Sequence, residues 1–312
     1  MLGDSTDNGQ AEEHALAVQR ARELAQRTGA AVLMIPGNHD YSSHYGPEDF
    51  RAQYAAFGTD LAFSRDTVSA SCAVMADGGI CLLLLDTNRR YGASSVLPDG
   101  GIAEETLAWA ESVLAGLPAG TPVIACGHHP ILPASRDQRT PGAAALAGLL
   151  RRCGVSLYLC GHDHGFATVT EEGLRQITVG QPQAYPGWAG LLTREETAFR
   201  WQTVRLYSED SPAWRLLRAS SETLAAAMAR GTLAGTAHEG DETAIRWFSD
   251  VFMAHVGGEL TPERCAALLA EDGSRLWREI ETKTVVKAWI FSLLEHCPEQ
   301  VQRLDIPLRR AE

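Results

Sequence analysis

Three short apolar runs in this chain each end near a glycine that is followed by asparagine or histidine. The runs are Ala31–Ile35 before Gly37-Asn38, Pro122–Cys126 before Gly127-His128, and Val155–Cys160 before Gly161-His162. Each has the length of a buried strand, and residues 10–28, 103–116 and 141–152 have helical patterns. Alternating strands and helices predict a sheet covered by helices. The glycine-led turns should then lie past the carboxyl ends of strands, where open α/β sheets place their sites.

Composition narrows the class of protein further. The 312 residues are 45% apolar and 21% charged, which is typical of a folded globular protein with one large domain or two smaller ones. The net charge of -12 argues against a nucleic-acid backbone as partner, because such binding needs a basic surface. No apolar run approaches the roughly 18 residues of a membrane span. The seven cysteines include no Cys-X-X-Cys pair, so we expect reduced, buried thiols in a cytoplasmic protein.

The pattern changes twice along the second half of the chain. Stretches rich in β-formers, which predict a second, mostly antiparallel sheet, are Phe166–Thr170, Leu174–Val179 and Phe199–Leu206. After Tyr207 the sequence becomes helical, with an apolar face between residues 274 and 296 that is typical of a core or a dimer seam. We therefore expect two domains, residues 1–206 and 207–312, and a homo-oligomer formed through the C-terminal helices is one hypothesis.

The histidine motifs have the spacing of metal ligands. In an extended segment the imidazoles of His162 and His164 lie on one side, so both can face the same cluster. The adjacent imidazoles of His128 and His129 point in opposite directions, so only one of them should reach a given metal. Taken alone, either pair is also compatible with ordinary loop histidines.

The segment Gly37-Asn38-His39-Asp40 offers a different set of groups. The Asn38 side-chain carbonyl is a neutral oxygen ligand, and His39 can face a substrate instead of the metal. Asp40 can hydrogen-bond the other imidazole nitrogen of His39 and so select its tautomer. A plain polar turn is the alternative for this motif in isolation.

Together with Gly3-Asp4, these motifs occur in the order found in one enzyme family. The chain resembles the calcineurin-like metallophosphoesterases, and within them the class III cyclic-nucleotide phosphodiesterases, particularly in Gly3-Asp4-X-X-Asp7 and His128-His129-Pro130. The resemblance implies an α/β fold, a four-layer α/β/β/α sandwich, with a two-metal site. It assigns the following metal ligands: Asp4, which bridges both ions, Asn38, His128, His162 and His164. It makes His39, with Asp40 beside it, the catalytic group that contacts the phosphate and assists the leaving oxygen.

The chain departs from the family pattern at its start. The family's first motif, Asp-X-His, lies upstream of Gly-Asp, and no Asp-X-His occurs here. We therefore expect an N-terminally truncated sandwich with a helical C-terminal extension, in which one metal keeps only Asp4 and His164. Glu12 and His14 are the nearest substitute, but two residues apart on a helix they diverge by about 200°.

The resemblance implies metal-dependent hydrolysis of a phosphate ester by a dinuclear site. Its ligands suit Mn, Fe or Zn, and the expected partner is a small phosphorylated substrate, such as a cyclic nucleotide. Phosphomonoesters, phospholipids and nucleotide sugars remain open as substrates. The alternative is a degenerate, non-catalytic member that acts in binding or assembly through its C-terminal helices.

Overall fold

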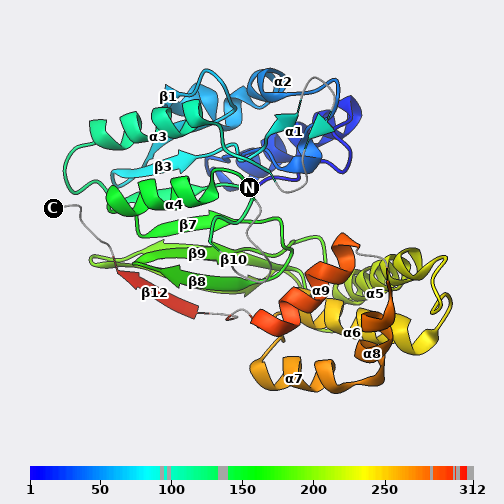
Figure 1. Ribbon diagram of the computed structural model, residues 1–312. Coiled ribbons are helices and arrows are strands. Elements are labelled where there is room, and N and C mark those ends of the chain that lie inside the picture. Colours follow the sequence, from blue (N-terminus) through cyan, green and yellow to red (C-terminus); the bar gives the residue numbers. More distant parts are fainter. Residues whose placement is uncertain are drawn as a thin grey trace.

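A seven-stranded sheet forms the centre of the computed structural model, which describes residues 1–91, 95–96, 100–132, 140–281, 284–297, 299 and 303–307. Its strand order is β1-β2-β3-β6-β7-β9-β8 (Figure 1). The strands are β1 (Ala62–Arg65), β2 (Cys72–Ala76), β3 (Ile80–Leu84), β6 (Val123–Cys126), β7 (Leu157–Cys160), β8 (Ala167–Glu171) and β9 (Leu174–Thr178). Because β3, β6, β7 and β9 are parallel, the loops after them meet at one edge of the sheet.

Alternating side chains on these strands form two cores. On one face, Leu83, Ala125 and Tyr158 pack under the helices α3 (Glu104–Gly116) and α4 (Ala143–Arg152). On the other face, neighbouring residues such as Leu84 and Ile124 pack against a second, antiparallel sheet. The strands of this sheet are β10 (Trp188–Arg194), β11 (Ala198–Arg205) and β12 (Arg303–Pro307).

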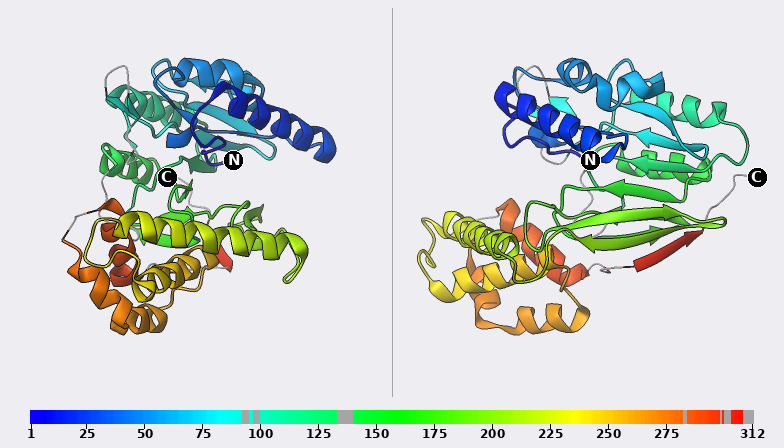
Figure 2. Two further views of the ribbon diagram at one scale, coloured as in Figure 1. Left: turned by 90° about the vertical axis from the view of Figure 1, so that its right-hand side faces the viewer. Right: turned by 180° about the vertical axis from the view of Figure 1, so that it is seen from behind.

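The fourth layer is formed by α1 (Ala11–Thr28), with α2 (Pro47–Gln53) beside it. The extended segment 31–35 lies between this helical layer and the core that separates the two sheets. Its residues Val32 and Met34 belong to the core under α1 and α2, whereas Leu33 and Ile35 belong to the core between the sheets. The predicted α/β/β/α sandwich is thereby confirmed, and the N-terminus lies in the middle of the molecule (Figures 1 and 2).

Two of the strand predictions need correction. Residues 31–35 do not form a regular strand, because the only bridge described for them is the parallel one between Leu2 and Ile35. The stretches that became β8 and β9 were expected in the second sheet but join the edge of the first one, where β9 runs parallel to β7. Strand propensity reflects a half-buried, pleated environment and does not specify the pairing partner.

The C-terminal region is helical but not entirely so. Its helices are α5 (Pro212–Leu233), α6 (Glu242–Gly257), α7 (Pro262–Ala270), α8 (Asp272–Glu279) and α9 (Val285–His296). They enclose their own aromatic core, which includes Trp247, Phe248 and Trp277. The predicted helical extension is therefore confirmed, and after α9 the chain returns to the sandwich, where β12 pairs with β11. The division into domains at residue 206 stays a prediction.

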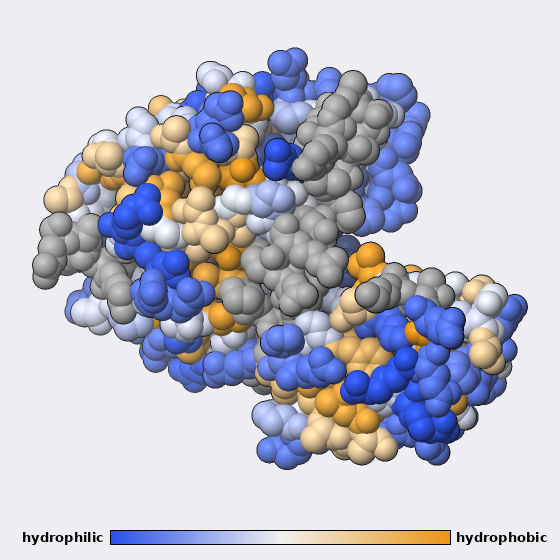
Figure 3. Space-filling model, viewed as in Figure 1, coloured by the Kyte–Doolittle hydropathy of each residue, from blue (hydrophilic) through white to orange (hydrophobic). Residues whose placement is uncertain are grey.

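Shorter elements and the surface complete the description. Three-residue 3-10 helices occur at Asn38–Asp40, Ala55–Phe57 and Thr59–Leu61, and a two-stranded ribbon joins β4 (Arg90–Tyr91) to β5 (Ser95–Val96). Figure 3 shows a hollow on the right, between the sandwich and the helical region, with hydrophilic residues on its upper side. Among the described residues, no helix has both the length and the apolar character needed to cross a membrane.

Candidate metal centre

Four ligand atoms from four different loops converge, and one of them is the Nε2 atom of His128. This Nε2 atom lies 3.1 Å from Asp4 Oδ2, 3.2 Å from Asn38 Oδ1 and 3.3 Å from His162 Nδ1. Asn38 Oδ1 also lies 3.1 Å from His162 Nδ1. Adjacent ligands of one cation, each about 2.1 Å from it, are about 3.0–3.4 Å apart in octahedral or tetrahedral geometry. These separations therefore fit a single divalent ion.

His128 is held in the tautomer that a metal requires. Its Nδ1 atom lies 2.7 Å from the carbonyl oxygen of Leu2. Because a carbonyl only accepts hydrogen bonds, Nδ1 carries a hydrogen. In the imidazolium the second hydrogen lies on Nε2 and is donated to Asp4, and a bound metal ion would take the place of that hydrogen. Burial lowers the pKa of His128, but the hydrogen bond and charge of Asp4 outweigh burial and leave the pKa raised.

Asp4 is positioned by an unusually close approach of two loops. Its backbone is left-handed, with φ of 52°, and Gly3 before it has φ of 87°. A Cβ atom on Gly37 would lie only 2.1 Å from Asp4 Oδ1, which also accepts a 2.9 Å hydrogen bond from the His39 amide. Burial raises the pKa of Asp4, but the hydrogen bond from His128 leads the effects that lower it, and the net shift is downward. The carboxylate is therefore available as an anionic ligand.

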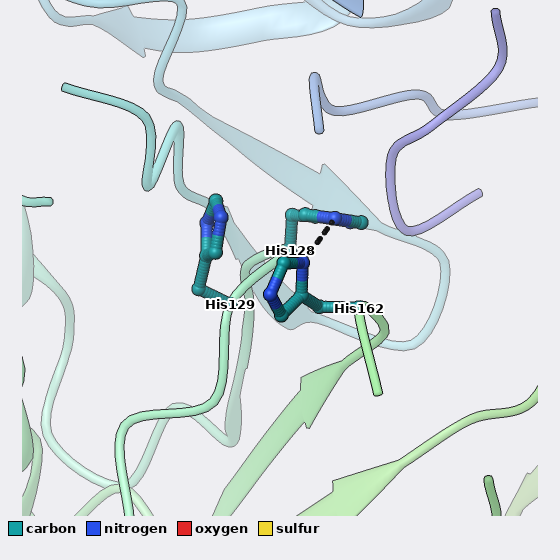
Figure 4. A group of neighbouring side chains, drawn as sticks. All are labelled: His128, His129 and His162. Atoms are coloured by element: carbon teal, nitrogen blue, oxygen red, sulfur yellow. Dashed lines mark hydrogen bonds between the residues drawn. The ribbon is translucent and has the colours of Figure 1, made fainter. Parts of the chain in front are cut away.

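His129 also lies close to His128 and His162, and ring nitrogens of the three lie within 4.8 Å of one another (Figure 4). Its Nδ1 atom is 2.8 Å from the hydroxyl oxygen of Thr87. That oxygen accepts hydrogen bonds from the backbone amides of His128 and His129, at 3.2 and 3.0 Å. Both lone pairs of the hydroxyl are thus used, so its one hydrogen is donated to Nδ1 of His129. Neutral His129 then carries its own hydrogen on Nε2. In this form Nε2 can donate a hydrogen bond but has no free lone pair for a metal ion.

The structure separates the roles of His39 and Asp40. His39 is exposed, and its Nδ1 atom lies 2.7 Å from the carbonyl oxygen of Asp7. Asp40 is fully buried, and its carboxylate accepts hydrogen bonds from the backbone amides of Ser5, Thr6 and Gly37 at 2.8–2.9 Å. The prediction that Asp40 orients the His39 ring is therefore wrong. A buried carboxylate is better satisfied by several amides than by one exposed ring, and here it ties the Asp4 turn to the Asn38 turn. Burial raises the pKa of Asp40 to about 6.

The remaining histidines of the motifs lie in two different places. His164 lines a cavity of about 730 Å³ together with Asp4, His128 and His162, and burial lowers its pKa to about 4. His14 is a fully buried residue of α1, and its ring stacks on Tyr45 at 3.7 Å and contacts the Tyr54 hydroxyl at 2.8 Å. His14 therefore belongs to a structural core, and Glu12 and His14 do not act as substitute ligands.

Two residues at the centre were not identified from the sequence. Thr87 follows the apolar run that became β3, so the pattern of a strand followed by a polar turn was available as a signal. His255 on α6 reaches the loop after β7, where its Nε2 atom is 2.5 Å from the carbonyl oxygen of Asp163. No local pattern in the sequence indicates this second contact, because 92 residues separate the two partners.

Comparison with known proteins agrees with this geometry. Residues 1–166, more than half of the chain, match the family model for calcineurin-like phosphoesterases. This chain is a member of the calcineurin-like phosphoesterase family. Members of this family bind divalent metal ions and hydrolyse phosphate esters, and the donor cluster around His128 lies in the matched region.

Solved structures and curated proteins add little to that assignment. A chain described as "GAP50 the anchor in the inner membrane complex of Plasmodium" is 14% identical, with a TM-score of 0.33. The match covers 65% of this chain and 82% of that one. No curated protein matches this chain.

Proposed function

We propose that this chain hydrolyses a small phosphodiester, such as a cyclic nucleotide, with the help of divalent metal ions. The observation that carries the proposal is the convergence of Asp4, Asn38 and His162 on the Nε2 atom of His128. These three residues and His128 all belong to the motifs that the family resemblance assigns to metal binding. The net charge of -12 favours a small substrate over a nucleic-acid backbone.

The donor set suggests how two ions would be held. Asp4, Asn38, His128 and His162 would hold the first ion, and Asp4 and His164 would contribute to the second, which is the less complete site. Oxygen and imidazole donors of this kind suit Mn, Fe or Zn. A bound divalent ion supplies Lewis-acid activation of the phosphate and of the attacking water.

His39 is the residue we assign to the leaving group. Its Nδ1 hydrogen is donated to the Asp7 carbonyl and the residue is exposed, which leaves Nε2 as the nitrogen for a substrate. As an imidazolium, His39 carries a second hydrogen on Nε2 and can transfer it to the ester oxygen while the bond from phosphorus to that oxygen breaks. Water forms the new bond to phosphorus.

We further propose that the protein works in the cytoplasm, and that the C-terminal helices are the surface for any homo-oligomer.

Substitution at the first ion tests the proposal. The full chain would be loaded with Mn²⁺ and assayed with bis-p-nitrophenyl phosphate and a cyclic nucleotide. We expect Asn38→Ala and His162→Ala to abolish turnover, and Asn38→Asp, which keeps an oxygen ligand, to retain part of it. His44→Ala is the matched control, because His44 is an exposed loop histidine. Near-normal turnover in either alanine variant would overturn the assignment. Mn²⁺ binding without turnover in the unchanged protein would favour the non-catalytic alternative.

A further inference from the structure

The helical region contacts the metal-binding loop after β7 through the imidazole of His255. This residue lies in the last turn of α6 and is 2% exposed. Its Nε2 atom donates a hydrogen bond to the carbonyl oxygen of Asp163, which stands between the two ligand candidates His162 and His164. Gly165 lies so close that a Cβ atom there would be 2.4 Å from the ring. The contact therefore joins two parts of the chain that are remote in sequence.

The loop needs such a contact because its own backbone is strained. His162 and His164 both have left-handed backbone conformations, with φ of 69° and 60°. Residues other than glycine rarely adopt this conformation, and it persists only where surrounding structure holds it. Asp163 lies between these two residues, so a bond to its carbonyl restrains the peptide on which both imidazoles depend. Without that restraint, the loop can relax and move both imidazoles.

Folding stability does not explain why a histidine occupies this position. The Nδ1 atom of His255 is buried and has no hydrogen-bond partner among the described residues. Leaving a buried polar atom unsatisfied costs more than a typical hydrogen bond contributes. An apolar ring of similar size would pack against Trp289, which contacts the His255 ring edge-on at 5.5 Å, without that cost. The remaining advantage of histidine is the hydrogen that it donates to the loop.

We propose that His255 is a positioning residue for the metal centre, through which the helical region holds His162 and His164 in their ligand orientation. The inference rests on the proposed function, since it concerns the same loop. It implies that the helical region is part of the metal centre's support and not an independent appendage. Groups that orient metal ligands typically change metal affinity by about 10- to 100-fold when they are removed.

Metal binding by variants of the full chain tests this inference. Affinity for Co²⁺ would be measured from its visible absorption, and stability from urea unfolding in chelator. His255→Phe keeps the ring volume and removes the donor, and we expect it to weaken Co²⁺ binding at least tenfold. His255→Gln places an amide hydrogen near the position of Nε2 and should stay within about threefold of the unchanged protein. The urea midpoint of His255→Phe should shift little, because removal of the unsatisfied Nδ1 atom offsets the loss of one hydrogen bond.

Trp289→Phe is the matched control, because it alters packing against the same ring but leaves the donor in place. If His255→Phe binds Co²⁺ as well as the unchanged protein, or if His255→Gln is the weaker of the two, the inference is wrong. The same conclusion follows if Trp289→Phe weakens binding as much as His255→Phe. If the unchanged protein binds no Co²⁺ at all, the proposed function fails, and this inference fails with it.

Discussion

Replacing Thr87 with valine should destabilise the metal centre, although the two side chains are nearly identical in size. Valine has the same shape as threonine but lacks the hydroxyl that accepts hydrogen bonds from the amides of His128 and His129 and contacts His129 Nδ1. Both amides belong to buried residues, so the substitution leaves two backbone donors without their partner. Each unsatisfied buried donor costs about 1–3 kcal/mol. Allowing for local relaxation, we expect a loss of about 3 kcal/mol in the free energy of unfolding.

Serine provides the matched comparison at this position. Thr87→Ser keeps the hydroxyl and removes only the methyl group, whose burial contributes about 0.8 kcal/mol. Unfolding by urea in chelator, followed by tryptophan fluorescence, separates the two variants if the slopes with denaturant are equal. We expect valine to be the less stable variant by about 2 kcal/mol, and to bind Co²⁺ more weakly, because the His128 backbone is no longer restrained. A valine variant as stable as the serine variant would refute the role assigned to the hydroxyl.

Three further predictions follow from the same structure. Gly37→Ala should weaken Mn²⁺ binding at least tenfold, because the new Cβ would lie 2.1 Å from Asp4 Oδ1. Gly116→Ala is the control, because its Cβ enters open space and should leave Mn²⁺ affinity unchanged. Calorimetric titration with Mn²⁺ measures the affinity of both variants. Mn²⁺ at about 100 times its dissociation constant should raise the free energy of unfolding by about 2.7 kcal/mol, and His162→Ala should lose this gain in urea melts. Asp66 accepts hydrogen bonds from Ser69 and Thr106, both 2.6 Å long. Burial raises the pKa of Asp66, but these hydrogen bonds outweigh burial and leave the pKa lowered. The Asp66 carboxylate therefore stabilises the folded protein fully above the pKa of Asp66 in the unfolded chain. This stabilisation is lost as the pH falls through the pKa of Asp66 in the folded protein. Urea melts between pH 7 and 3 should therefore show the deficit of Asp66→Asn shrinking below about pH 4.

Each of these predictions has an outcome that contradicts it. Equal Mn²⁺ affinity in the two glycine variants would mean that the loops tolerate a wider separation than the structure has. An equal gain from Mn²⁺ in the unchanged protein and in His162→Ala would place the bound ion elsewhere. A deficit of Asp66→Asn that is independent of pH would show that the pKa of Asp66 is the same in the folded and the unfolded protein.

Much of the fold could be predicted from local sequence, because hydrophobic periodicity and turn-forming residues act over short distances along the chain. The helix at residues 10–28 was predicted to within one residue of α1, which begins at Ala11 and ends at Thr28. The apolar runs before Gly127 and Gly161 became β6 and β7, and their loops meet because parallel strands end at the same edge. The order of the four glycine-led motifs was enough to identify the family, which the match over residues 1–166 supports.

Tertiary structure decided the properties that depend on partners far away in the chain. The pairing of β9 with β7, the return of β12 to β11 and the burial of His14 all depend on which surfaces meet after folding. Asp40 illustrates the reason: its neighbour His39 was the obvious partner, but its carboxylate is buried against amides 34 and 35 residues away. Sequence reveals which groups can ionise, bind metal or donate hydrogen. The desolvation and the competing donors that select one partner exist only once the chain has packed.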